Sequence, residues 1–432
     1  MRLTPAEAFA DGLEFLWQDQ YGDQIGVAVS GGSDSLALLV LAHDWAKQHR
    51  FDLRAVTVDH RLRSEVAEEI AHVASVCRDL GIPHNVLVWD GWDGSGNLQA
   101  EARAARYALI DGWIADHGLD FVLLGHTADD QAETFLMRLA RGSGVDGLAG
   151  MASSKDEYLR PLLGTTRQAL RDMLSARHIE WCEDPSNEDD RFDRIKARKM
   201  MGHLAELGLT QDRILQTAQH MASAKLALEW AAYEFAKSKI IQQDGDLLIP
   251  VKTFYGVGGD TQSRVISGAI RWIGGGAYRP RYESLFEMAQ RVAKGEKRTL
   301  QGVIFSKEGQ MIRLAREFNK AFEAPLVEAV FEGPNSFVIW DQRWGVSQSD
   351  EKPNWFDLKR SVKAAPNLTI RALGESLKDV PDWRETGLPR ASLMASPAVF
   401  DGETLISAPI AGLQNGFSAR IVADYQSFLL SR

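Results

Sequence analysis

The chain has 432 residues, of which 45% are apolar and 25% are charged, and its formal net charge at pH 7 is −10. This length exceeds what one hydrophobic core supports, so we expect two or three domains, and the ordinary composition excludes a chain that is disordered throughout. The acidic balance argues against indiscriminate binding to nucleic acid, which depends on neutralising phosphates with cations. A specific RNA partner would have to use local basic patches.

The sequence favours a cytoplasmic protein without a membrane anchor. Its first residues, MRLTPAEAFADGLEFLW, combine acidic side chains with a helical period, and no later stretch reaches about 18 uncharged apolar residues. The two cysteines, Cys77 and Cys182, lie far apart and form no CxxC pair, which suits a reducing compartment. We therefore expect neither a disulfide framework nor a structural metal site.

The first strong feature is an apolar run followed by a loop of glycines and hydroxyl side chains. The run at 25–29 predicts a buried strand, and a helical pattern begins at Leu36. Between them stand Ser30, Gly31, Gly32, Ser33, Asp34 and Ser35. Glycines let the backbone approach an anion, serines offer hydroxyl donors, and the N–H groups of the following helix point to the same place. The stretch predicts a phosphate-binding loop; an ordinary strand-to-helix turn is the alternative.

Strands and helices then alternate as far as residue 141. The pattern predicts strands at 53–58, 84–89 and 121–124, and helices at 65–80, 97–116 and 129–141. Ser64 is the expected N-cap of the first of these helices. Such alternation predicts a parallel, doubly wound α/β sheet, whose ligands bind beyond the carboxyl ends of the strands. The loops at Ser30, Asp59 and Gly125 all follow such ends.

The next part of the chain leads into a basic stretch. A glycine-rich loop at 142–151, a helix at 166–177 and a turn at 183–187 are predicted before it. The stretch itself, RFDRIKARK at 191–199, contains five cations and one acid. Further on, the isolated arginines are Arg264, Arg271, Arg279 and Arg281. Each basic group is either an RNA contact or a solvated face.

Three domains are predicted. We place the first boundary between Met201 and Leu209, because the spacing of Ile214 and Ala218 indicates that a long helix follows at 210–239. The expected domains are a catalytic α/β domain at 1–205, a largely helical or mixed middle domain at 210–320, and a small β-rich domain at 325–432. Short apolar runs, prolines and turn residues indicate strands in the last of these.

Four motifs, taken together, resemble one known family. The loop at 30–35 has neither the lysine nor the spacing of a nucleotide triphosphatase P-loop, and resembles the SGGxDS loop of the ATP pyrophosphatases, the PP-loop superfamily. The other three are the segment at 58–63, NLQAEARAARY at 97–107, and LLGHTADDQAETFLMRLARGSGVDGLAGM at 123–151. In this order they resemble the tRNA(Ile)-lysidine synthetase family over residues 20–200. GEKRTLQGVIF and LARE, further along, suit the same family.

The resemblance implies an ATP-dependent ligase with a PP-loop catalytic domain. Such an enzyme joins free L-lysine to C2 of the wobble cytidine in an isoleucine tRNA with the anticodon CAU. ATP first adenylates the C2 oxygen and releases pyrophosphate, and the lysine ε-amine then expels AMP. The resemblance further implies Mg²⁺, tRNA contacts in the middle domain and tRNA recognition in the C-terminal domain. It leaves a homodimer open.

The resemblance also implies site residues, each with an alternative role. It makes Asp34 and Asp130 catalytic, and places ATP against Ser30, Gly31, Gly32, Ser33, Asp34, Ser35, His60, Gly125 and His126. It assigns Mg²⁺ to Asp34, Asp129 and Asp130, lysine and nucleotide to Glu101, Arg103 and Arg106, and tRNA to Arg194, Lys196 and Arg198. Asp129 and Asp130 are alternatively a helix cap and a first-turn acid, and His60 a hydrogen-bonded, partly buried histidine. The residues at 101–106 are alternatively surface ion pairs, since one helix cannot aim all three at one point.

The chain departs from the family at two positions. Thr127 stands where many members have a second histidine, and Ile195 stands where asparagine is common. Two other functions remain open: tRNA thiolation by a related pyrophosphatase, and RNA binding without catalysis. Thiolation generally requires a reactive cysteine pair or an iron–sulfur cluster, which Cys77 and Cys182 do not convincingly supply. A binding protein would not need carboxylates beside a phosphate loop.

Overall fold

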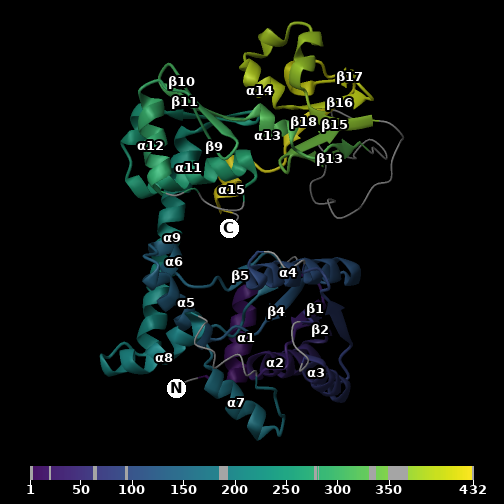
Figure 1. Cartoon of the computed structure of the whole chain (residues 1–432), viewed down its shortest axis with the longest axis vertical. Coiled ribbons are helices and arrows are strands. Elements are labelled where there is room, and N and C mark those ends of the chain that lie inside the picture. The colour runs from purple at the N-terminus through teal and green to yellow at the C-terminus, as the bar shows by residue number, and fades with distance from the viewer. Residues whose placement is uncertain are drawn as a thin grey trace. The chain divides into compact units, whose positions relative to one another are not determined.

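The computed structural model describes residues 3–18, 21–61, 66–92, 96–183, 193–276, 280, 282–329, 337–348 and 368–430. The predicted cap Ser64 and most of the predicted turn at 183–187 lie outside these residues, as do Arg191, Arg279 and Arg281. The chain separates into two compact units, Met1–Lys225 and Leu226–Arg432 (Figure 1). The division into three domains stays a prediction.

The first unit is built around a six-stranded sheet in the order β3-β2-β1-β4-β6-β5. Its strands are β1 (Gln24–Ala28), β2 (Asp52–Asp59), β3 (His84–Val88), β4 (Phe121–Leu124), β5 (Ser154–Lys155) and β6 (Tyr158–Leu159). β1 pairs in parallel with β2 on one side and β4 on the other, whereas β5 runs antiparallel to β6. The predicted parallel, doubly wound sheet is confirmed.

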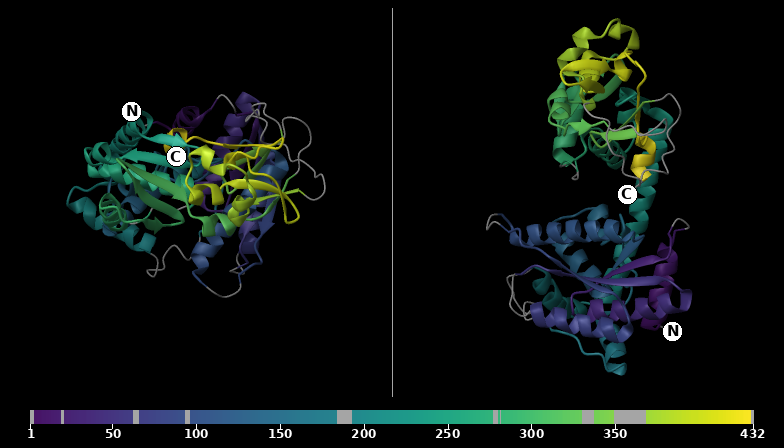
Figure 2. Two further views of the ribbon diagram at one scale, coloured as in Figure 1. Left: turned by 90° about the horizontal axis from the view of Figure 1, so that it is seen from above. Right: turned by 90° about the vertical axis from the view of Figure 1, so that its right-hand side faces the viewer.

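Helices cover both faces of this sheet. The helices of the first unit are α1 (Pro5–Leu16), α2 (Ser33–His49), α3 (Val66–Leu80), α4 (Leu98–His117), α5 (Ala128–Ala140), α6 (Val145–Leu148), α7 (Arg167–Ala176) and α8 (Asp193–Glu206). Figure 2 shows α4 over one face and α2 with α3 over the other. Side chains alternate along β1 accordingly: Val27 packs in the core with α2, and Ala28 packs with Ile110 of α4. Both faces are therefore buried, as a parallel sheet requires.

The topology creates a crevice between β1 and β4. The connection from β1 through α2 covers one face, and the connection from β3 through α4 covers the other before the chain returns to β4 beside β1. The strand order therefore reverses between β1 and β4, and ligands of doubly wound sheets bind at such a switch point. The loops at 30–35 and 125–130 both begin there.

The second unit combines helices with three sheets. The sheets have the orders β7-β8-β11-β10-β9, β12-β15-β16-β17 and β13-β14-β18. The strands are β7 (Ile241–Gln243), β8 (Asp246–Pro250), β9 (Arg298–Leu300), β10 (Val303–Glu308), β11 (Met311–Arg316), β12 (Val327–Glu328), β13 (Phe337–Trp340), β14 (Trp344–Ser347), β15 (Leu368–Ala372), β16 (Pro397–Asp401), β17 (Thr404–Ser407) and β18 (Ser418–Ile421). The mixed middle region and the β-rich end of the chain are as predicted.

The helices of this second part begin with α9, which runs through the boundary between the two units. They are α9 (Gln211–Lys239), α10 (Val251–Tyr255), α11 (Gly259–Gly274), α12 (Tyr282–Ala293), α13 (Phe318–Phe322), α14 (Arg390–Met394) and α15 (Tyr425–Leu430), with 3-10 turns at Gly374–Asp379, Trp383–Thr386 and Pro409–Ala411. Within the described residues, no helix is both long and apolar enough to cross a membrane.

The packing of β1 against α4 yields a first prediction. A Cβ atom on Gly26 would lie 2.8 Å from both Trp113 Cζ3 and Val122 Cγ2, so a side chain would force the sheet and α4 apart. We expect Gly26→Ala to lower the free energy of unfolding by about 1–3 kcal/mol, measured by urea titration. The control is Gly112→Ala on α4, where a Cβ meets no atom within 4 Å. This change should raise the free energy of unfolding by up to about 1 kcal/mol, because alanine favours a helix more than glycine does. Equal effects of the two changes would contradict the packing argument.

Candidate active site

The loop at 30–35 is held in shape by its own serines. Ser35 Oγ accepts a hydrogen bond from the Ser30 backbone N–H at 3.0 Å and donates one to the Gly32 carbonyl at 3.1 Å. Gly31 has φ of 85°, which L side chains rarely adopt, and Gly32 is the N-cap of α2. Because this N-cap has no side chain, nothing from the cap residue competes with an anion for the first N–H groups of α2.

A second loop, from β4 to α5, approaches the first closely. A Cβ on Gly125 would lie 3.1 Å from the Asp34 carbonyl oxygen and from Ser35 Cα, so a side chain here would push the loops apart. Thr127 is the N-cap of α5, and its hydroxyl and backbone N–H both donate to Asp130 Oδ2, at 2.9 and 2.8 Å. Thr127, where the chain departs from the family, thus supplies a helix cap, and α5 begins one residue earlier than predicted.

The two loops border a cavity of about 360 Å³. Ser33, Asp34, His126 and Asp130 all lie in its wall. A second cavity, of about 260 Å³, shares Ser30 and Arg106 with the first. Apolar side chains dominate the second cavity: Val56, Val58, Ile70 and Ile110. A polar chamber and an apolar chamber therefore adjoin each other at the carboxyl ends of the strands.

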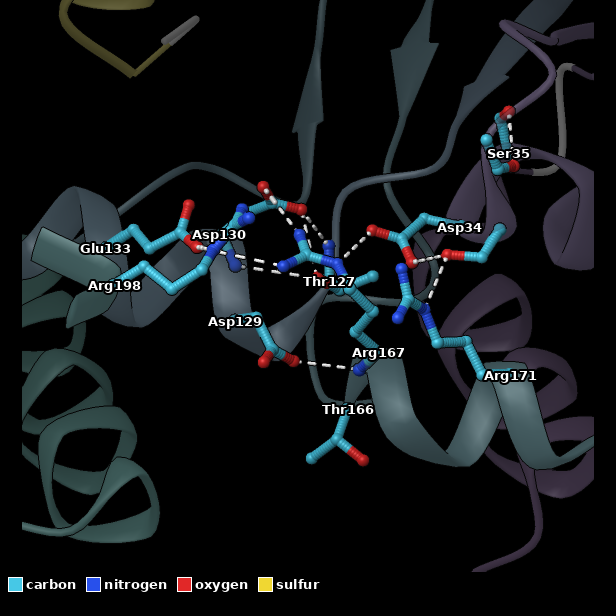
Figure 3. A network of polar contacts seen from close by, with 12 residues as sticks. Asp34, Ser35, Thr127, Asp129, Asp130, Glu133, Thr166, Arg167, Arg171 and Arg198 are labelled. Atoms are coloured by element: carbon cyan, nitrogen blue, oxygen red, sulfur yellow. Dashed lines mark hydrogen bonds and ion pairs between the residues drawn. The ribbon is translucent and has the colours of Figure 1, made fainter. Parts of the chain in front are cut away.

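Arg167 is the central cation of the polar chamber. Its Nε donates to Asp34 Oδ2 at 2.8 Å, while Nη2 lies 3.6 Å from Asp130 Oδ1 and Nη1 lies 3.8 Å from Glu133 Oε1. Figure 3 shows the guanidinium between Asp34 on one side and Asp130 and Glu133 on the other. One residue at the start of α7 thus links α2 and α5.

Glu133 gathers further cations from α8. Its side chain is only 3% exposed, and its Oε1 accepts a hydrogen bond from Arg198 Nε at 2.8 Å. Arg194 Nε lies 3.6 Å from the other carboxylate oxygen. Lys196 is exposed, and its Nζ lies 3.8 Å from Asp193. The three cations predicted to contact tRNA are therefore not brought together in one patch, because two of them face a buried carboxylate.

The three predicted metal ligands are not brought together either. Asp34 and Asp130 face each other across Arg167, but Asp129 Oδ2 accepts a hydrogen bond from the Arg167 backbone N–H at 2.8 Å (Figure 3). Asp129 thereby satisfies a free N–H at the start of α7. In the described part of the chain, no group of three or more acidic, histidine or cysteine side chains is arranged to hold a metal.

The remaining predicted residues divide between cavity and surface. Arg106 lines both chambers, and burial lowers its pKa. His60 lines the apolar chamber edge-on to Trp89, and its buried Nδ1 has no hydrogen-bond partner among the described residues. Arg103 is exposed and its guanidinium lies 5.1 Å from the ring centre of Tyr107. Glu101 is also exposed on α4.

Burial dominates the electrostatics of the chamber. Burial raises the pKa of Asp34, and the neighbouring Arg167 opposes this rise. Burial likewise raises the pKa of Glu133, against the hydrogen bond from Arg198. Burial lowers the pKa of His126 to about 4. The carboxylates are therefore costly charges that depend on nearby arginines, and His126 is neutral at pH 7.

Three residues of this site were not predicted from the sequence: Glu133, Arg167 and Arg171. Arg171 Nε donates to Ser33 Oγ at 3.3 Å, so Arg167 and Arg171 both reach the phosphate loop from one face of α7. Their i, i+4 spacing, which places two cations on one helix face, was the available signal. Glu133 follows Asp129 at the same spacing on α5.

Comparisons with known proteins extend over both compact units. The family model of the PP-loop domain matches residues 5–204. A tRNA(Ile)-lysidine synthase from Ruegeria pomeroyi is 42% identical, covering 94% of this chain and 93% of the relative. One from Wolbachia pipientis is 33% identical, covering 85% and 86%. A solved U34-tRNA thiolase from Methanococcus maripaludis has a TM-score of 0.44 and 17% identity, covering 50% of this chain and 79% of that chain.

The lowered pKa of His126 gives a prediction for acid stability. Between pH 6.5 and 4 the unfolded chain binds a proton at this imidazole that the folded chain does not, so stability falls as pH falls. From pH 7 to pH 5 we expect the wild type to lose about 1–2 kcal/mol more than His126→Gln, measured by urea unfolding at each pH. The exposed His203→Gln is the control and should behave as the wild type. Identical losses in all three proteins would show that His126 is not responsible.

Proposed function

Since the chain belongs to the tRNA(Ile)-lysidine synthase family, we propose that it ligates free L-lysine to C2 of the wobble cytidine in an isoleucine tRNA with the anticodon CAU. The energy comes from ATP, through an adenylated tRNA. The observation that carries the proposal is the phosphate-type loop at the switch point of the sheet, in a chain related to lysidine synthases over 94% of its length.

The two adjoining chambers suit the two halves of ATP. The polar chamber offers the loop at 30–35, the start of α2 and the guanidinium groups of Arg167 and Arg171 to the phosphates. The apolar chamber, with Val56 and Ile110, offers a surface for the adenine ring. Arg106 lines both chambers, so it would lie near the α-phosphate, which the cytidine C2 oxygen attacks.

Asp34 and Asp130 are the residues that would hold Mg²⁺. Magnesium in such sites is bound by one or two carboxylates together with substrate phosphates, so two acids facing one chamber fit it. When bound, Mg²⁺ would neutralise charge on the phosphates. Asp129 turns its carboxylate to the backbone of α7, and the proposal therefore narrows the predicted ligand set to the other two.

The protein's own side chains would stabilise the developing charge and limit the access of water. Arg167, Arg171 and Arg198 line the polar chamber and would stabilise the charge that develops on the phosphates as pyrophosphate leaves. The chemistry requires no covalent nucleophile from the protein, because the lysine ε-amine itself attacks C2. Asp34 and Asp130 are only 18% and 11% exposed, which limits the water beside them and would favour transfer to lysine over hydrolysis.

The two cysteines do not support the alternative function, tRNA thiolation. Burial raises the pKa of Cys77 to about 11 and also raises the pKa of Cys182, which lines the polar chamber. Sulfur transfer by cysteine requires a thiolate, and a raised pKa keeps the thiol protonated at neutral pH.

The direct test is product formation by the purified protein. With ATP, Mg²⁺, L-lysine and unmodified tRNA, mass spectrometry should detect lysidine at the wobble position. Asp34→Asn should lower the rate of lysine-dependent pyrophosphate release by about 100-fold or more, because it removes a carboxylate charge from the phosphate chamber.

The matched control is Asp44→Asn on the same helix, α2. Asp44 pairs with Arg177 at 2.6 Å on the surface, so its loss should leave the rate unchanged. Absence of lysidine from the tRNA would refute the proposed function. Near-normal turnover in folded Asp34→Asn would refute the role of Asp34.

The basic residues of α8 give a separate prediction. Lys196→Gln should weaken tRNA binding and lower the slope of log K against log salt by about one for a lost phosphate contact. Arg198→Gln should in addition weaken ATP binding, because Arg198 lines the polar chamber. Filter binding of tRNA at several salt concentrations and calorimetry with ATP separate the two effects. An unchanged salt slope in Lys196→Gln would mean that this residue is a solvated surface charge.

A further inference from the structure

The contacts of Arg167 point to a role beyond electrostatic stabilisation. We infer that Arg167 is an internal counter-ion, which stands between Asp34 and Asp130 in the free protein and moves to the polyphosphate when a divalent cation takes its place. The inference rests on the proposed function for the identity of the phosphates. In the free protein, Arg167 thus acts as a positioning residue, because it keeps Asp34 and Asp130 close to each other before a divalent cation enters.

The three carboxylates around Arg167 are not held equally. Asp34 accepts a hydrogen bond at 2.8 Å, whereas Asp130 and Glu133 lie at 3.6 and 3.8 Å, beyond hydrogen-bonding distance. The Arg167 side chain is 19% exposed and lies in the wall of the polar chamber. Its contacts with α5 are therefore charge attraction in a partly open site, which an entering ion can replace.

The consequences of moving Arg167 differ among its partners. Glu133 would keep Arg198 at 2.8 Å, and Asp130 would keep the two hydrogen bonds from Thr127 on its other oxygen. Asp34 would keep one contact, from Ser33 Oγ at 3.2 Å. The carboxylate oxygens left without a cation are thus those of Asp34 and Asp130, which both face the chamber.

The helix that carries Arg167 directs it toward the phosphate loop. The backbone N–H of Arg167 donates a hydrogen bond to Asp129 at 2.8 Å, so the start of α7 stays in place when the Arg167 side chain moves. One turn later on the same face, Arg171 already reaches Ser33 Oγ in the loop. A guanidinium released from Asp34 would still face the chamber in which the phosphates are proposed to bind, and its fork suits phosphate oxygens.

The alternative is a fixed structural ion pair that joins α7 to α2. The chain contains a matched example, because Arg177, the C-cap of α7, pairs with Asp44 of α2 at 2.6 Å, with both side chains more than a third exposed. A structural pair and a counter-ion predict different responses to divalent cations. Loss of Arg177 frees one exposed carboxylate, whereas loss of Arg167 frees Asp34 and Asp130, which both face the polar chamber.

The test measures Mn²⁺ binding to the full chain without nucleotide, lysine or tRNA, by electron paramagnetic resonance. We expect Arg167→Gln to bind Mn²⁺ at least about tenfold more tightly than the wild type, because the two carboxylates lose their competing cation. Mn²⁺ should also raise the melting temperature of this variant and not that of the wild type. Arg177→Gln should match the wild type in both measurements.

Arg167→Lys keeps the test decisive if Arg167→Gln does not fold. A single ammonium cannot span Asp34 and Asp130 as the guanidinium does, so this variant should bind Mn²⁺ about threefold or more tightly than the wild type. Equal Mn²⁺ affinity in the wild type and in the folded Arg167 variants would overturn the inference. Lysidine formation is assayed separately on the wild type, so a failed proposal for function leaves the Mn²⁺ result standing, and the reverse also holds.

Discussion

The close approach of two loops at the carboxyl ends of β1 and β4 is the constraint on which the site depends. Gly125 permits it, since a Cβ there would lie 3.1 Å from the Asp34 backbone. The approach brings Asp34 of α2 and Asp130 of α5 to one chamber, and Glu133 lies 3.8 Å from the arginine between them. Buried like charges repel one another and lose hydration, so the fold has to supply cations from elsewhere. α7 and α8 supply them, which explains why the first compact unit extends well beyond its sheet.

The need for cations beside the buried carboxylates also links α8, near the end of the first compact unit, to α5 at the active site. Arg198 of α8 hydrogen-bonds to Glu133, and α9 follows directly, packing Ile214 and Ala218 against Ala132 and Phe135 of α5. α5 therefore serves three purposes along its length. Its first turn carries Asp130 at the chamber, its middle binds the cations of α8, and its apolar face supports the start of α9.

Features set by neighbours in sequence were predictable, and features set by distant residues were not. The strand at 121–124 was predicted to the residue, because a short apolar run ends at a glycine. The cap at Thr127 could have been found from Asp130 three residues later. The pairing of Arg167 with Asp34 joins residues 133 positions apart, and the pairing of Arg198 with Glu133 spans 65. A basic stretch alone cannot reveal that Arg194 and Arg198 lie against a buried carboxylate, and their contact with tRNA stays a prediction.

The balance of charge in the polar chamber explains how an acidic protein accommodates a polyanion. The chamber is lined by four arginines and four carboxylates: Arg106, Arg167, Arg171 and Arg198, with Asp34, Glu69, Asp130 and Glu183. Without nucleotide, these charges offset one another, which limits the cost of burying them. A triphosphate adds several negative charges to a site that has no surplus of positive ones. Its entry is therefore favourable only if cations enter with it, or if arginines are released from the carboxylates that they neutralise. An entering cation that displaces Arg167 from Asp34 and Asp130 meets both conditions at once.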